Sequence, residues 1–190
     1  MNPLLPVILA AAAMGLIVSV FAAVWASRYV KVGPNRVLIV SGRQHQLADG
    51  TRRGFRIVKG GGTFVVPVIE KVEVLSLEVI TIEMPEWRGR TAKGVPVEAD
   101  CLAQVKIKGD DASILAAAEH FLSKDEGEVK NIVRPVLEKH LRTILSSLSV
   151  EEVDRDLEAC AKRVEGAASQ DLGNMGLGIV SFTIRPVRAG

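Results

Sequence analysis

Residues 95–107, VPVEADCLAQVKI, alternate between apolar and polar side chains more regularly than the rest of the chain. The polar members face one way, with Leu102 as the exception. Such a period of two, apolar on one face only, is typical of a half-buried strand in an antiparallel sheet. The apolar face consists of Val95, Val97, Ala99, Cys101, Ala103, Val105 and Ile107.

The residues before this stretch predict further strands. Short strands are expected at residues 36–41 and 63–68, and the dipeptide Asp49–Gly50 and the triplet Gly60–Gly62 predict turns between them. From Lys71 to Met84 the apolar alternation changes phase, which predicts either bulges or two successive strands.

The residues after it predict helices. Asp110 or Asp111 caps a helix over residues 112–122, and Ser123-x-x-Glu126 is a capping-box pattern that opens a second helix. The second helix should kink or break at Pro135, because proline removes an intrahelical hydrogen bond. Its apolar stripe comprises Val129, Ile132, Val133, Val136, Leu137, Leu141, Ile144, Leu145 and Leu148, with His140 among them.

A second capping box, Ser149-x-x-Glu152, predicts a third helix that ends near Gly173–Gly176. Residues 179–185 then predict a closing strand. Strands, helices and one returning strand make an α+β domain over residues 28–190, with a strand-rich half at 28–108 and a helical half at 109–190. The inward face of the third helix comprises Val153, Leu157, Cys160, Ala161, Val164, Ala168 and Leu172.

The stretch Leu4–Ala26 carries no charge and meets the length of about 20 residues that a membrane-spanning helix needs. A signal peptide would need positive residues at its start and a better cleavage site, and a buried soluble helix would show a polar face. We therefore predict a membrane anchor at residues 1–27, either a transmembrane helix or a re-entrant hairpin around Gly15. The anchor residues are Leu4, Leu5, Val7, Ile8, Leu9, Leu16, Ile17, Val18, Val20, Phe21, Val24 and Trp25, with Arg28, Tyr29 and Lys31 at the interface.

The charges and the remaining composition limit the function. Basic residues directly after the anchor favour a cytoplasmic location for the rest of the chain. With 24 basic and 22 acidic side chains the net charge is +2, which gives no nucleic-acid footprint. The sequence thus favours a protein of the cell membrane whose partners are lipids and other membrane proteins.

No motif makes a case for an enzyme, a cofactor or a metal. Cys101 and Cys160 fall on apolar faces and are expected to be buried thiols, and His140 is expected to be a structural helix histidine. The Gly60–Gly62 triplet lacks the Gly-Lys-Ser/Thr ending of a phosphate-binding loop. Residues 88–90, Arg-Gly-Arg, and Lys93 are expected in a solvated loop.

Several segments together resemble the SPFH (band 7, prohibitin homology) domain, specifically its flotillin branch. The resemblance begins at residues 29–35, YVKVGPN, and continues through residues 56–67, RIVKGGGTFVVP. Its most specific parts are residues 137–144, LEKHLRTI, residues 149–153, SVEEV, and residues 171–184, DLGNMGLGIVSFTI.

The resemblance implies a non-enzymatic scaffold that attaches to the inner leaflet, self-associates into large oligomers and organises lipid and protein microdomains. It brings no catalytic residues. Flotillins continue into a long coiled coil after this domain, and the present sequence has no heptads before it stops at Gly190. An alternative with the same fold is a regulatory subunit that binds a membrane protease or another membrane enzyme.

Overall fold

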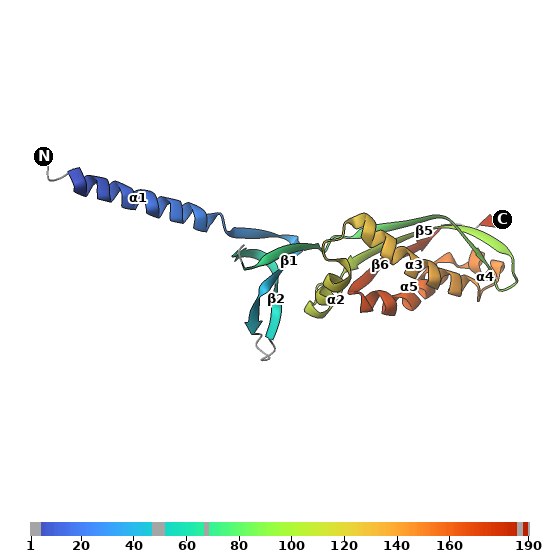
Figure 1. Cartoon of the computed structure of the whole chain (residues 1–190). Helices are drawn as coiled ribbons and strands as arrows, with labels where there is room; N and C mark the ends of the chain where they lie inside the picture. Colours follow the sequence, from blue (N-terminus) through green and yellow to red (C-terminus); the bar gives the residue numbers. More distant parts are fainter. Residues whose placement is uncertain (1–4, 47–51, 67–68, 186–187, 190) are drawn as a thin grey trace. The chain divides into compact units, whose positions relative to one another are not determined.

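The computed structural model describes residues 5–46, 52–66, 69–185 and 188–189. The chain divides into two compact units, residues 1–73 and residues 74–190 (Figure 1). We call them unit 1 and unit 2. The predicted Asp49–Gly50 turn lies outside the described residues.

Unit 1 contains helix α1 (Leu5–Ala26) and most of a small sheet, whose third strand continues past the unit boundary at Glu73. Strands β1 (Tyr29–Gln46), β2 (Arg52–Phe64) and β3 (Lys71–Ser76) lie in the order β2-β1-β3. The strand predicted at 36–41 is confirmed as the middle of β1. The core is formed by Val32, Leu38 and Val40, with Val30, Val58 and Val72 packed against them.

The Gly60–Gly62 triplet is not a turn, so that prediction was wrong. The three glycines lie within β2, opposite an irregularity at which β1 residues 33–36 face only Gly60. Gly60 and Gly61 have φ angles of 64° and 76°, which residues other than glycine rarely adopt because their Cβ atom clashes with the backbone. The glycines therefore allow a bulge inside one long hairpin, where the sequence suggested a break.

Unit 2 contains a sheet in the order β4-β5-β6, formed by β4 (Ile80–Arg90), β5 (Pro96–Ile107) and β6 (Leu177–Ile184), with β7 (Arg188–Ala189) also paired to β5. The strand predicted at 95–107 is confirmed, and all its expected inward residues from Val97 onward are buried. The phase slip between Lys71 and Met84 separates β3 from β4. The residues 88–90 form the end of β4, so the loop predicted there was wrong.

Helices α2 (Asp111–Phe121), α3 (Glu126–Leu145), α4 (Val150–Arg155) and α5 (Leu157–Asn174) complete unit 2. Figure 1 shows α3 and α5 side by side, and α3 packs on β4 while α5 packs on β6. Their buried residues follow the predicted stripes. On α3 they are Val129, Val133, Leu137, Leu141 and Leu145, and on α5 they are Cys160, Ala161, Val164, Ala168 and Leu172.

Two helix boundaries differ from the prediction. The box that caps α3 is Asp125 with Glu128, because Ser123 has a φ of 63° and cannot take the extended conformation of an N-cap. The predicted third helix is split at Asp156, whose side chain accepts a hydrogen bond from the Ala159 N–H and caps α5. Pro135 lies inside α3, which continues past it without a break.

Two strand details also differ from the prediction. Strand β2 ends at Phe64, so Val65 and Val66 lie outside it and residues 67–68 are outside the described part. In the last strand, strict alternation would place Val180 on the same face as Phe182 and Ile184, yet Val180 is 46% exposed while the other two are buried. The register between β5 and β6 shifts at this point, because Gln104 pairs with Ser181 and Val105 with Ile179.

Among the residues that the structure describes, no helix has the length and apolar character that crossing a membrane requires. The transmembrane helix predicted for the first 27 residues is therefore not supported.

Candidate functional site

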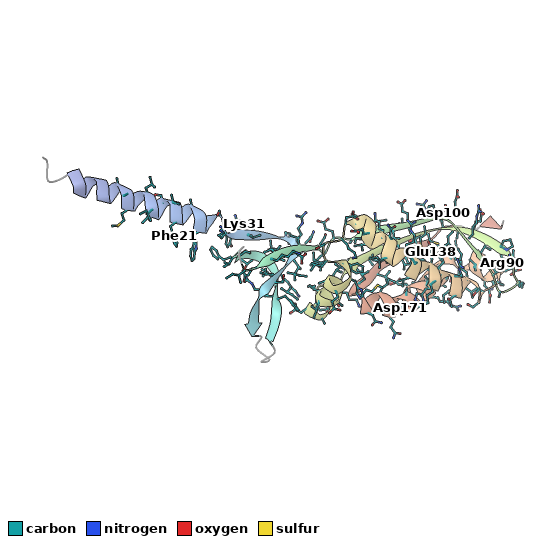
Figure 2. The ribbon with its side chains drawn as sticks, viewed as in Figure 1. Phe21, Lys31, Arg90, Asp100, Glu138 and Asp171 are labelled. Carbon is teal, nitrogen blue, oxygen red and sulfur yellow. The ribbon has the colours of Figure 1, made fainter. Side chains whose placement is uncertain are left out.

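The described side chains of helix α1 present an apolar surface to solvent on every side of the helix. Seven large apolar residues are more than half exposed: Met14, Leu16, Ile17, Val18, Val20, Phe21 and Trp25. Figure 2 shows Phe21 pointing away from the helix. A soluble protein seldom exposes so much contiguous apolar surface, and such a surface marks a site that binds lipid or another protein.

The structure places the predicted anchor residues on this one helix as far as they are described. Leu5, Val7, Ile8, Leu9 and Val24 belong to α1, but their side chains are outside the described set, and Leu4 lies outside the described residues altogether. The predicted interfacial residues follow directly, with Arg28 and Lys31 exposed and Tyr29 43% exposed.

A cluster of aromatic rings joins the end of α1 to the sheet. The centroid of the Trp25 ring lies 5.7 Å from that of Phe21 and 6.0 Å from that of Phe64, and the Tyr29 ring lies 5.2 Å from Phe64. These tilted arrangements are favourable for aromatic pairs. We call Phe21, Trp25, Tyr29 and Phe64 the aromatic cluster.

The backbone holds this cluster in place. Tyr29 pairs with Phe64 at the start of β1, and the Val65 N–H donates to the Arg28 carbonyl at 3.2 Å. The Tyr29 ring lies across Gly62, where a Cβ atom would overlap it. The third glycine of the triplet therefore makes room for the tyrosine.

A partly buried ion pair, in which Glu70 is the buried member, supports the turn that follows the cluster. Arg56 donates to Thr63 Oγ1 at 2.9 Å, to the Phe64 carbonyl at 2.8 Å and to Glu70 Oε2 at 3.4 Å. The same Glu70 oxygen accepts the Val66 N–H at 3.0 Å, and the Glu70 side chain is only 5% exposed. Buried charges need such partners, because an unpaired charge away from water is costly.

This turn presents more apolar surface. Phe64 is 51% exposed, Val66 46% and Ile69 57%. Sequence reasoning placed Phe64 and Val66 in a strand and gave them no functional role. Pro67, which cannot donate to a sheet ladder, was the available signal that the strand ends before it.

The other candidate residues occupy structural positions. Cys101 and Cys160 are buried free thiols, as expected. Burial raises the pKa of Cys101 to about 12 and raises that of Cys160 as well, which keeps both in the unreactive thiol form at neutral pH. His140 Nε2 bonds Asp171 Oδ2 at 2.9 Å and links α3 to α5.

Sequence reasoning missed the Asp171 carboxylate as the partner of His140, because the two residues are far apart in the chain. The carboxylate also lies 3.4 Å from the Lys139 ammonium. These hydrogen bonds, from His140 first and Lys139 second, hold the pKa of Asp171 below its usual range. In the described part of the chain, no group of three or more His, Cys, Asp or Glu side chains could hold a metal ion.

Comparison with known proteins identifies the class of this domain. The model of the SPFH domain / Band 7 family matches residues 30–189, so the chain belongs to that family. Within it, the chain is similar to flotillins, which confirms the predicted branch.

Three relatives give the extent of the similarity. The Flotillin-like protein FloT of Bacillus subtilis (strain 168) is 40% identical over 189 residues, which are 97% of this chain and 37% of FloT. Flotillin-1 of Drosophila melanogaster is 38% identical over 161 residues, 84% of this chain and 36% of the relative. Human Flotillin-1 is 36% identical over 156 residues, which are 82% of this chain and 35% of the human protein. The chain therefore spans little more than a third of these relatives.

Proposed function

We propose that this chain is the membrane-attached SPFH domain of a flotillin-type scaffold, a non-enzymatic protein that self-associates and organises lipids and proteins at the cell membrane. The observation that carries the proposal is the exposed apolar surface of α1, which continues into the aromatic cluster of unit 1. Family membership supports the scaffold role, since flotillin-like relatives match 82–97% of the chain.

In this proposal α1 inserts into the bilayer and the aromatic cluster lies at the level of the headgroups. Transferring one large apolar side chain out of water contributes about 1.5–3 kcal/mol, and α1 presents several. Trp and Tyr favour the interface because their rings are apolar and their N–H or O–H remains hydrated. Arg28 and Lys31 then face the anionic headgroups, and unit 2 lies on the cytoplasmic side.

Vesicle binding of the full chain tests the attachment. The chain has two tryptophans, so a Trp87→Phe variant leaves Trp25 as the only indole. We expect Trp25 emission to shift to the blue on adding phospholipid vesicles, because a ring that is 59% exposed in water enters the interface. Quenching by lipids brominated at different depths then reports how far the ring inserts.

Matched variants distinguish specific attachment through α1 from non-specific hydrophobic binding to vesicles. Leu16→Asn with Val20→Asn should abolish vesicle binding, because both exposed residues lie on α1. Val79→Asn with Val180→Asn removes two exposed valines of unit 2 and should leave binding unchanged. Equal binding by both double variants would refute attachment through α1.

Self-association is tested separately. We expect the full chain to migrate as a species much larger than 20.4 kDa in mild detergent, and cross-linking in membranes to give self-contacts. A clean monomer would contradict self-association of this domain. One dominant enzyme partner in the cross-linking would instead support the regulatory-subunit alternative.

A further inference from the structure

Unit 2 contains a hollow of about 610 Å³ where the end of β4 meets the last turn of α3. Its lining residues are Arg88, Gly89, Arg90, Pro96, Arg142 and Ser146. Figure 2 labels Arg90 near the end of unit 2. Half of the lining is arginine and none of it is acidic, which is an unusual concentration of one charge for a chain of net charge +2.

The protein backbone fixes the arginines that line this hollow. Arg88 and Arg90 stand on β4 beside the buried Trp87, whose ring lies over Gly89 at a place where a Cβ would overlap it. The hairpin after β4 is tied to the segment that follows α3, because the Ala92 N–H donates to the Leu148 carbonyl at 2.9 Å. Residues from the end of β4 and from the last turn of α3 therefore line the same hollow, and three of them are arginines.

The positive charge at this hollow is only partly balanced. Arg88 Nε lies 2.7 Å from Glu98 Oε1 on the neighbouring strand. Within the part of the chain that the structure describes, neither Arg90 nor Arg142 belongs to an ion pair. Lys93, on the same hairpin, pairs with Glu151 at 3.3 Å. Like charges held around one hollow repel each other, and a bound anion relieves that repulsion.

We propose that this hollow is a binding site for a phosphate group, with Arg90 and Arg142 as the principal ligands and Arg88 as a third cation. A guanidinium offers parallel N–H donors that match two oxygens of a phosphate, and several guanidiniums can share its oxygens. A phosphate group can belong to a soluble molecule or to a lipid headgroup, and the two sources are distinguished by experiment.

Titration calorimetry of the full chain in a neutral detergent, with pyrophosphate as the probe, tests the site. We expect measurable binding that weakens as salt rises, since the contacts are ionic. Arg90→Gln with Arg142→Gln should weaken binding at least tenfold, because two charged hydrogen-bonding groups are lost. Lys106→Gln with Lys124→Gln removes the same charge from exposed positions elsewhere on unit 2 and should change the affinity less than twofold.

Lipid vesicles supply the second arm. Phosphatidic acid presents a phosphate monoester, and phosphatidylcholine of the same acyl chains does not. In one outcome pyrophosphate does not bind, the wild type prefers phosphatidic acid vesicles, and the arginine double variant loses that preference. The phosphate then belongs to a lipid headgroup. If pyrophosphate binds and vesicle composition has no effect, it belongs to a soluble ligand. Either result supports the site.

Three results would overturn the proposal. The first is no effect of the arginine double variant in either arm. The second is an equal effect of the lysine control, which would show a general response to net charge. The third is equally tight binding of succinate, which would make the site one for carboxylates. Circular dichroism of both double variants confirms that they fold, and Arg90→Lys with Arg142→Lys shows whether charge alone suffices.

Discussion

Cys101 shows at the residue scale how surroundings remove reactivity. Its side chain lies on the buried face of β5, and burial is the main cause that raises the pKa of the thiol to about 12, with the charge of Asp100 as a second cause. A thiol is reactive only as the thiolate. The buried thiol expected from the sequence is therefore also an unreactive one at neutral pH.

Thiol labelling at pH 8 makes this testable. With a pKa of about 12, Cys101 is roughly 0.01% thiolate at that pH, against about a quarter for a free cysteine of pKa 8.5. We expect iodoacetamide to label Cys101 about a thousandfold more slowly in the native chain than in urea. A Cys160→Ser variant isolates the signal, and fast native labelling would contradict the burial of Cys101.

Asp171 gives a pH-dependent prediction. Its folded pKa is lowered because it accepts hydrogen bonds from His140 and Lys139. A lowered carboxyl pKa adds stability above the unfolded value of about 3.9, and this stability is lost as the pH falls through the folded pKa. The free energy of unfolding of the wild type should therefore fall when the pH is lowered from 5 to 2. We expect it to fall less in Asp171→Asn, which lacks this carboxylate, and urea titration at each pH measures both. Glu119→Gln, an exposed change on α2, is the control. If the unfolding free energy of Asp171→Asn fell with pH as much as that of the wild type, the Asp171 carboxylate would not stabilise the contact between α3 and α5.

Helix α3 shows at the element scale how tertiary packing overrides a local signal. Pro135 predicts a kink or a break, yet the helix runs from Glu126 to Leu145. Five of its residues are buried against the rest of unit 2, and burying that stripe outweighs the hydrogen bond that proline removes. Pro135 itself is exposed, so its ring fills no core position.

Replacing Pro135 should therefore stabilise unit 2. Pro135→Ala restores a backbone N–H inside α3 and removes a residue of poor helix propensity, so we expect the unfolding free energy to rise by about 1–3 kcal/mol. Chemical denaturation followed by far-ultraviolet circular dichroism measures it. A loss of stability would instead mean that the packing of α3 on α5 and β4 requires the proline at this position.

At the scale of the whole molecule, the chain consists of two compact units with separate cores. The partly buried Arg56–Glu70 pair belongs to unit 1 alone. Its loss should act on the stability of that unit, because unit 2 has its own sheet and helices.

Amide hydrogen exchange tests this independence. We expect Glu70→Ala to speed exchange in β2 by about ten- to a hundredfold, since a charged hydrogen bond contributes about 1.5–3 kcal/mol. Exchange in β5 and β6 should stay the same. Lys71→Ala removes an exposed ion pair with Glu73 and serves as the control. Equal acceleration in both units would show that they unfold together.

The sequence alone determined the α+β class, the strand at 95–107, the buried stripes of the helices and the family. These features depend on local periodicity and on capping patterns, both of which involve residues that are close together in the sequence. The membrane anchor that the sequence predicted at residues 1–27 stays a proposal, because the described residues contain no helix that could span a membrane.

Only the tertiary structure decided the remaining features, because each depends on residues far apart in the chain. Gly60–Gly62 continue a strand since β1 bulges opposite them, and Phe64 joins Trp25 and Tyr29 since β2 returns beside β1. The arginine hollow forms because β4 ends at the last turn of α3. The spacing of residues in the sequence specifies individual helices and strands. The contacts between them depend on how the whole chain packs into its state of lowest free energy.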